Sequence, residues 1–415
     1  MTSRRRITVA AAAAAMGVSL VVGGIVRPVS HRQPTRLPDV ATLQMGVCAV
    51  QGASGGLVGG STPGASVRLL TDSSATLDPA AAVTAAVVVT QTATGGVLPP
   101  GVNLTSSTGR SFAACSEPAS TSAVQVLDPS TADILLVNPD KTQAVVNLSL
   151  NSVGGNLTSA GSRGLTIAPG QVRVVPISVL APGSDPVTVV QTATQGRVVM
   201  VARTIDGSVD QISATQPAKD LLLAGIASGS SRTRLVIGNT GDERTGVTIK
   251  AMNGRGEYVP VGTEEVSVDG QTSVMLDLTS ALVGEATALR VTSDKGPIVA
   301  TAEVRVGSDT AMIGPAQTST TITDIPTSSV IQVVNPGSAV AVVSIISAGR
   351  TTQLRVPARG AAGTQIQAEQ VVTLKSATPV AAASIVSTQG VAVQPLRPAV
   401  VQSTQVRIEQ DPSLG

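Results

Sequence analysis

The sequence predicts an all-β protein: tandem immunoglobulin-like antiparallel β-sandwich domains behind one N-terminal transmembrane helix. Three observations support this prediction. An apolar phrase ending in an asparagine turn recurs about every hundred residues, the segments between turns alternate apolar and polar residues, and residues 7–26 carry no charge. Alternation with period two is typical of half-buried strands, and short strands with frequent turns over ~100 residues are typical of a β-sandwich.

The recurring phrase reads ILLVNPDKTQAVV, RLVIGNTGDERTGVTI and VIQVVNPGSAVAVVSII. Asn138 and Asn239 lie 101 residues apart, and Asn335 follows 96 residues later. Asparagine tolerates unusual backbone angles and proline presets φ, so both suit turns. We therefore expect these asparagines to end strands rather than to form a recurring ligand site.

Between the turns, residues 146–150 (VNLSL) and 273–278 (SVMLDL) alternate apolar and polar letters. We expect the apolar positions of both segments to face a core and the polar positions to face solvent. Later landmarks keep an offset of 100: Gly170 and Gly270, Gly196 and Gly296, and then Arg203 and Glu303.

These landmarks predict the organisation of the chain. A second QTAT, at Gln91 as well as Gln191, suggests a degenerate β domain before the first clear repeat, whose completeness the sequence leaves open. The predicted segments are a cytoplasmic basic tip (1–6), a transmembrane anchor or signal segment (7–26), a Pro-rich stalk (27–38), the degenerate domain (39–118), β-sandwich repeats (119–215, 216–315 and 316–400) and a C-terminal tail (401–415).

The N-terminal segment predicts the compartment. Three arginines, Arg4 to Arg6, precede 20 uncharged residues, a length that can cross a bilayer as a helix, and a basic flank stays cytoplasmic. We expect a single-pass cell-membrane protein with an extracytoplasmic bulk, or a secreted one if the segment is cleaved. The sequence leaves open both cleavage and the choice between the general and twin-arginine export routes.

Cys48 and Cys115 are the two cysteines of the chain. Outside the cytoplasm a disulfide between them is the default expectation, and it would close a loop worth ~4 kcal/mol in chain entropy. Two free buried thiols are the alternative.

Composition narrows the function classes. Six of the 28 basic residues precede the first acid, and the remaining 22 face 26 acids, so no basic surface for nucleic acid is expected. With one Tyr, one Phe and no Trp, stacking platforms for sugars or single strands are disfavoured. The frequent Ala, Gly, Val and Arg suggest a GC-rich, actinobacterial genome.

No catalytic, cofactor-binding or metal-binding residue is predicted. The single histidine, His31, lies in the predicted stalk. We therefore expect no His-dependent triad or general base in the folded domains. GASGG at residues 52–56 matches a nucleophile elbow formally but lacks its strand-to-helix context. Residues 292–295 (TSDK) are predicted to form a hairpin turn.

The scattered acids Asp206, Asp210 and the pair Asp242 and Glu243 lack the dense oxygen spacing of a calcium loop. We expect them to lie on solvated turns.

The repeated L-x-x-x-N-P phrase with its later Pro-Gly turn, behind one membrane segment, resembles an actinobacterial family of exported, membrane-anchored β-repeat proteins of unknown function. The resemblance covers residues 110–400. In SFAACSEP, residues 111–118, the chain keeps Phe112 beside Cys115 but has no Trp there. The resemblance implies a cell-envelope location and no catalytic residues.

The sequence thus favours a non-catalytic extracytoplasmic surface protein, a spacer or docking module whose partners are unidentified envelope proteins, with no cofactor and no small-molecule substrate evident. A glycan- or peptidoglycan-binding module and a carboxylate-based hydrolase are the alternatives.

Overall fold

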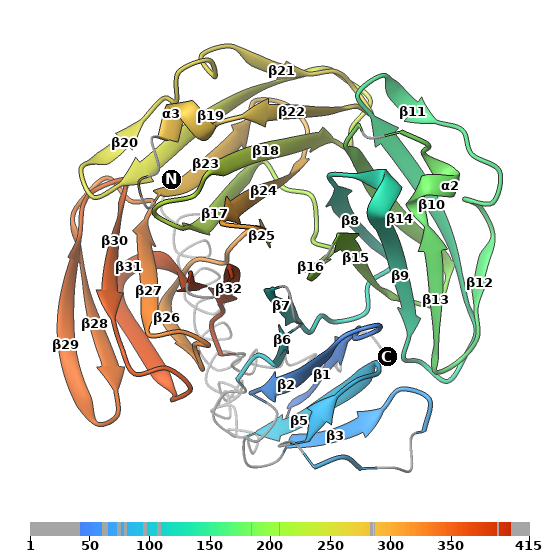
Figure 1. Cartoon of the computed structure of the whole chain (residues 1–415), viewed down its shortest axis with the longest axis horizontal. Helices are drawn as coiled ribbons and strands as arrows, with labels where there is room; N and C mark the ends of the chain where they lie inside the picture. The colour runs from blue at the N-terminus through green and yellow to red at the C-terminus, as the bar shows by residue number, and fades with distance from the viewer. Residues whose placement is uncertain are drawn as a thin grey trace, which may run out of the picture. The chain divides into compact units, whose positions relative to one another are not determined.

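The computed structural model describes residues 42–399, apart from 60–64, 73–75, 79–80, 94–97, 106–108, 184, 207, 283–284, 286 and 388–389. The predicted tip, anchor and stalk lie outside this part of the chain, as does the predicted tail. Within the described residues, no helix has the length and apolar character needed to cross a membrane. The described chain is almost entirely antiparallel β, as predicted (Figure 1).

The strands fall into four units along the chain. In the first unit, one sheet has the order β1-β5-β3 and the other β4-β2-β6-β7. Its elements are β1 (Thr42–Cys48), β2 (Ser54–Val58), β3 (Ala65–Leu69), β4 (Ala82–Val83), β5 (Val87–Ala93), β6 (Gly101–Thr105) and β7 (Arg110–Ala114).

The second unit pairs the sheet β11-β10-β14-β8, which also carries β12, with the sheet β13-β9-β15-β16. Its elements are β8 (Thr121–Val126), the 3-10 helix η1 (Pro129–Thr131), β9 (Ala132–Asn138), β10 (Ala144–Ser152), β11 (Gly155–Leu157), β12 (Leu165–Ile167), β13 (Gln171–Pro176), α2 (Ile177–Leu180), β14 (Val187–Gln195), β15 (Val199–Asp206) and β16 (Ser208–Ser213).

The third unit repeats this topology, with the sheet β17-β23-β19-β20, which carries β21, and the sheet β22-β18-β24-β25. Its elements are β17 (Asp220–Ile226), β18 (Arg232–Asn239), β19 (Thr245–Asn253), β20 (Gly256–Tyr258), β21 (Val266–Val268), β22 (Ser273–Asp277), α3 (Thr279–Leu282), β23 (Thr287–Ser293), β24 (Ile298–Val306) and β25 (Asp309–Ile313).

The fourth unit is shorter because one long strand, β31, takes the place of two. Its N-terminal half pairs with β26 and β28, and its C-terminal half pairs with β27 and β32. Its elements are β26 (Ser319–Asp324), β27 (Val330–Asn335), β28 (Ala341–Ser347), β29 (Arg350–Val356), β30 (Gly360–Gln365), β31 (Val372–Val386) and β32 (Ala392–Leu396).

The predicted alternation is confirmed in β10, where Val146, Leu148 and Leu150 are buried in the core of the second unit. It holds less well in β22, because Ser273 is completely buried. Its hydroxyl lies 2.7 Å from the Thr188 hydroxyl of the second unit, whereas Met275 and Asp277 on the same face are exposed, as predicted.

The recurring asparagines have the same structural role in three units. Asn239 is fully buried; its Nδ2 donates to the carbonyl oxygens of Glu243 (2.7 Å) and Val268 (3.1 Å), and its Oδ1 accepts from the Gly241 amide (2.9 Å). Asn138 and Asn335 are buried and bond to the backbone in the same pattern. Each side chain therefore ties the end of a strand to its turn, as expected from the sequence.

The turn at residues 292–295 differs from the prediction. It joins β23 in one sheet to β24 in the other, so it is a crossover between sheets and not a hairpin. Asp294 Oδ1 stabilises it by accepting from the Thr245 hydroxyl and the Gly246 amide, both at 2.8 Å.

Consecutive units pack face to face. Val47 and Val88 of the first unit meet Leu135, Val199 and Val201 of the second in one apolar cluster. The next contact is more polar: Gln125 Nε2 donates to the Val299 carbonyl (3.0 Å) across the second and third units. Between the third and fourth units, apolar side chains surround the bond from the Gly225 amide to Gln332 Oε1 (2.8 Å).

The last strands of the four units close this series into a cycle. β7 contacts β16 and β32, and β25 contacts the same two strands (Figure 1). Asp309 Oδ2 accepts from the Arg110 amide (3.1 Å) and from the Val391 amide (2.8 Å), which joins the third unit to the first and the fourth. A Cβ at Gly109 or Gly390 would overlap this carboxylate, so both positions suit glycine.

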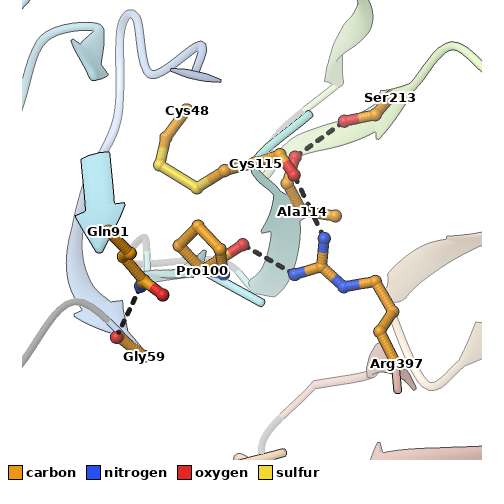
Figure 2. The surroundings of a disulfide bond; sticks show 8 residues. All are labelled: Cys48, Gly59, Gln91, Pro100, Ala114, Cys115, Ser213 and Arg397. Carbon is orange, nitrogen blue, oxygen red and sulfur yellow. Dashed lines mark hydrogen bonds between the residues drawn. A yellow bond between two sulfur atoms is a disulfide. The ribbon is translucent and has the colours of Figure 1, made fainter. Parts of the chain in front are cut away.

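Cys48 and Cys115 form a disulfide in the interior of the first unit (Figure 2). Arg397, which follows the last strand, donates to the carbonyl oxygens of Cys115 (3.1 Å) and Pro100 (2.6 Å), beside the disulfide. The disulfide therefore supports a segment against which the C-terminal end of the described chain packs.

Replacing Asn239 by alanine should lower the free energy of unfolding by about 2–4 kcal/mol, because two buried carbonyls and one amide lose their partner. Urea denaturation of the purified protein measures this change. Thr248→Ala, on an exposed position of β19, is the control and should change stability by at most ~0.5 kcal/mol. Equal stabilities of the two variants would contradict the structural role of the asparagine.

The double variant Cys48→Ala/Cys115→Ala should be less stable than the oxidised protein by about 4 kcal/mol, since the bond spans 67 residues of sequence. A reducing agent should lower the melting temperature of the wild type and leave that of the double variant unchanged. A wild type insensitive to reduction, with both thiols titratable under denaturing conditions, would contradict this expectation.

Candidate functional site

A polar cavity of about 210 Å³ lies between the second and third units. It is distinctive because charged side chains line it and because several of their atoms are buried without hydrogen-bond partners. The lining residues are Leu127, Asp128, Thr131, Thr204, Asp210, Arg232, Arg234, Glu303, Arg305, Thr310 and Met312.

Strand register explains how the third unit builds its wall of the cavity. Arg232 pairs with Arg305 and Arg305 with Thr310, while Arg234 pairs with Glu303. Because side chains two apart on a strand share a face, these residues lie together on one face of the sheet β22-β18-β24-β25. The alternate positions, such as Ala302 and Val304, are buried in the core of the third unit.

Glu303 is held between two guanidinium groups. Arg232 donates to Oε1 through Nη2 (2.7 Å) and Nε (3.1 Å), and Arg234 contacts both oxygens, with its shortest bond to Oε2 (2.7 Å). Charge-assisted bonds of this kind are short and strong. Two arginines thus face one carboxylate, which leaves a surplus of positive charge beside Glu303.

Two other groups in the wall lack partners among the described residues. The Nε of Arg305 and the hydroxyl oxygen of Thr131 are buried and make no hydrogen bond. A buried donor without an acceptor costs roughly 1–3 kcal/mol. Such atoms mark a place where a bound molecule or water would supply the missing contact.

Asp210 lies on β16 and is 4% exposed, which corrects the prediction that it lies on a solvated turn. Its Oδ2 accepts from the Thr310 hydroxyl (3.0 Å), whereas Oδ1 makes no hydrogen bond of ordinary geometry within the described chain, although the Ser111 hydroxyl lies near the carboxyl. Burial raises the pKa of Asp210 to about 7, and the charges of Asp309 and Glu303 act in the same direction; the hydroxyls of Thr310 and Ser111 oppose the rise.

The equivalent position between the first and second units has the opposite charge order. There Asp133 pairs with Arg203, as Arg234 pairs with Glu303, and the two side chains form an ion pair. Arg203 Nη1 also donates to the Gln51 carbonyl of the first unit (2.8 Å). In this contact the chain itself supplies an acceptor to the guanidinium.

Between the third and fourth units the same position is apolar. Val330 has the same offset from Asn335 that Asp133 and Arg234 have from their asparagines. Ile385 and Val393 occupy the adjoining positions on the neighbouring strands β31 and β32. Ile385 and Val393 are buried. The fold therefore does not require charge at this position, which makes the charged cavity a specific feature of one contact.

A second hollow, of about 310 Å³, lies on the second unit along β10 and β11. Its polar wall includes Asn147, Ser149, Asn156 and Arg163. Asn156 Nδ2 donates to the Ser149 hydroxyl (2.6 Å), and Asn147 Oδ1 accepts from the Gly164 amide (2.8 Å). We call this hollow the polar groove.

Other residues singled out in the sequence do not converge on a site. In the GASGG segment, Ser54 begins strand β2, and the next element among the described residues is strand β3 rather than a helix, so the strand-to-helix turn of a nucleophile elbow is not seen there. Asp242 and Glu243 lie on an exposed turn, as predicted. His31 and the side chain of Asp206 lie outside what the structure describes. No group of three or more metal-ligating side chains occurs in the described part of the chain.

The cavity was not predicted from the sequence, although one feature of its wall is visible there. The strands predicted around Arg234 and Glu303 carry charges at alternate positions, R-T-R and E-V-R, within otherwise apolar segments. Buried charges are rarely found without partners, so this alternation could have indicated a charged face. The approach of this charged face to Asp210 depends on packing between units, and nothing in the sequence indicates it.

Replacing Asp210 by asparagine should change how stability depends on pH. Between pH ~4 and 7 the folded protein keeps a proton on Asp210 that the unfolded chain releases, so the free energy of unfolding of the wild type falls as pH rises through this window. We expect the fall to be smaller by about 2–4 kcal/mol in Asp210→Asn. Urea denaturation at several pH values measures it.

Asp324 provides an internal reference, because burial raises its pKa to about 6 while Arg397 opposes the rise. The part of the pH dependence due to Asp324 should persist in Asp210→Asn and vanish in Asp324→Asn. Identical pH profiles for the wild type and Asp210→Asn would show that the Asp210 carboxyl does not hold a proton in the folded state.

Comparisons with known proteins identify the family but no activity. No curated protein matches the chain significantly. A Streptomyces avermitilis α-L-rhamnosidase in complex with L-rhamnose aligns over 86% of this chain and 57% of its own, at 9% identity and a TM-score of 0.14. A Ca²⁺-stabilised ice-binding adhesin of an Antarctic bacterium aligns over 87% and 98%, at 11% identity and a TM-score of 0.13. At these scores neither likeness carries an argument. A family model matches residues 58–383, well over half of the chain, and the protein therefore belongs to that family, described as a family of unknown function (DUF5719).

Proposed function

We propose that this protein is a non-catalytic extracytoplasmic surface protein, a docking module for a protein complex of the cell envelope. In this proposal residues 7–26 anchor it in the cell membrane, or direct its secretion if they are cleaved, and the immunoglobulin-like β-sandwich units lie outside the cytoplasm. The Cys48–Cys115 disulfide supports an oxidising compartment. Its partners would be envelope proteins.

The observation that carries the proposal is the closed cycle of contacts among the four units. Asp309 joins three units through the amides of Arg110 and Val391, and Arg397 ties the end of the last unit to the first. A string of independent domains would act as a flexible spacer. Units joined by buried contacts instead hold loops of different units in constant positions, as a docking surface needs.

Two exposed apolar side chains offer places to look for a partner. Val179 in α2 of the second unit is 72% exposed, and Val261 in the third unit is 82% exposed. Isolated exposed valines are common on protein surfaces. They are useful here because a photoreactive residue at either position would lie at the surface without removing a buried contact.

The test is site-specific photocrosslinking in intact cells that naturally produce the protein, followed by mass spectrometry of the membrane fraction. Photoreactive residues at positions 179 and 261 should yield a small, reproducible set of envelope proteins, absent from a matched probe at Arg255, which is also exposed. Identical products at all three positions, or none, would count against docking.

The polar groove favours a glycan-binding module as the second candidate. Its amide, hydroxyl and guanidinium groups can recognise sugars by hydrogen bonding without aromatic stacking. Saturable binding to purified cell wall that Arg163→Gln weakens, with no protein captured by the photocrosslinker, would favour this function over docking.

The cavity between the second and third units does bring acids together, as a carboxylate-based hydrolase would need, namely Asp128, Asp210 and Glu303. However, both oxygens of Glu303 accept from arginines, so no free carboxylate oxygen remains on it to act as nucleophile or base. This arrangement supports binding better than hydrolysis.

A further inference from the structure

We propose that the cavity between the second and third units binds a small organic monocarboxylate, whose carboxylate is held by Arg305 while Asp210 donates a proton to one of its oxygens. This binding site is independent of the docking role. It follows from which atoms in the cavity are without partners and from the balance of charge around them.

The Nε of Arg305 is a hydrogen-bond donor without an acceptor. It is buried and unpartnered, although the guanidinium lines the cavity. A guanidinium presents parallel N–H donors that match the two oxygens of a carboxylate. In the contact of the first two units, the Nε of Arg203 is buried without a partner as well, but there Nη1 donates to the Gln51 carbonyl.

The Oδ1 of Asp210 identifies the second half of the site. This atom is also buried without a partner, on a side chain that lines the same cavity. A neutral carboxyl has one donor to offer, and a ligand carboxylate beside Arg305 would accept it. Arg305 and Thr310 are register partners, and Thr310 bonds to Asp210, so the guanidinium and the carboxyl approach one cavity from neighbouring positions.

The charges around Asp210 favour a ligand with a single negative charge. Glu303 and Asp309 face it from β24 and β25, Arg232 and Arg234 from β18, Arg305 from β24, Asp128 from the loop after β8, and the Ser111 hydroxyl from β7. Glu303 neutralises one of its two arginines, so the surplus of positive charge is small. A dianion such as sulfate would meet nearby carboxylates, whereas a monocarboxylate would not exceed the available charge.

The volume limits the size of the ligand. The cavity of about 210 Å³ equals the share of roughly seven water molecules, and it is below the ~300–1,000 Å³ of pockets for drug-sized ligands. A molecule the size of a hydroxy acid, an amino acid or a monosaccharide acid fits this description. The threonines of the wall, Thr131, Thr204 and Thr310, suit a ligand that also carries a hydroxyl group.

Binding should depend on pH because the neutral form of Asp210 is the one that can donate. The carboxyl titrates near pH 7 in the free protein, so a ligand that requires its proton should bind about tenfold more weakly at pH 8 than at pH 6. Asp210→Asn retains a donor at every pH. Its affinity should be the same at both pH values.

The experiment is isothermal titration calorimetry of the full-length protein, purified in detergent, with acetate, lactate, glucuronate and sulfate as probes at pH 6 and pH 8. We expect lactate or glucuronate to bind, acetate to bind more weakly and sulfate weakest. The hydroxylated probes distinguish a hydroxy acid from a sugar acid as the source of the carboxylate. Tighter binding of sulfate than of every carboxylate, or no binding of any carboxylate, would overturn the proposal.

Variants of cavity residues test whether the heat measured in the titration comes from binding in the cavity. Arg305→Gln should lose at least tenfold in affinity, and Arg305→Lys, which keeps the charge but not the parallel donors, should also bind more weakly. Arg163→Gln, in the polar groove, is the matched control and should bind like the wild type. A melting curve for each variant identifies folded protein. Wild-type affinity in folded Arg305→Gln, or an unchanged pH dependence in Asp210→Asn, would refute the site.

Discussion

The buried carboxylate of Asp309 is the contact on which the arrangement of the four units depends. It is 2% exposed and accepts backbone amides from the first and fourth units while belonging to the third. A buried carboxylate is costly unless its oxygens are bonded, and here each oxygen accepts at least one amide, one of them from Thr310. The glycines beside it, Gly109 and Gly390, let both backbones approach closely enough. Removing the carboxylate would leave amides of two units unpaired at once.

The three face-to-face contacts between consecutive units use the same strands for different purposes. Between the first and second units, this position holds an ion pair whose arginine also donates to a backbone carbonyl. Between the third and fourth units it holds buried aliphatic side chains. Between the second and third units, arginines surround Glu303 and a cavity lies beside them. Burial of aliphatic groups alone would stabilise each contact. Burying charges between the second and third units costs desolvation free energy that the fold does not require. A bound ligand would offset this cost.

Sequence reasoning predicted the local features that repeat. The role of Asn138, Asn239 and Asn335 followed from turn chemistry, and the buried face of β10 followed from its alternation. It was wrong about Asp210, about Ser273 at the start of β22 and about the turn at residues 292–295, because in each case a contact with another sheet or unit changed the surroundings of the residue. Period and turn residues describe a strand and its ends, and they do not identify the sheet that a strand joins.

The all-β class and the positions of the recurring turns could therefore be predicted from the sequence, since these features depend on interactions within a few residues of one another. The folded arrangement alone shows which faces of the sheets meet, that Asp309 and Arg397 close the units into a cycle, and that Asp210 and Arg305 line one cavity. These contacts join residues about 80 to 300 positions apart in the chain, such as Arg397 and Pro100, and depend on the desolvation and pairing of charges at surfaces that form only when whole sheets pack together.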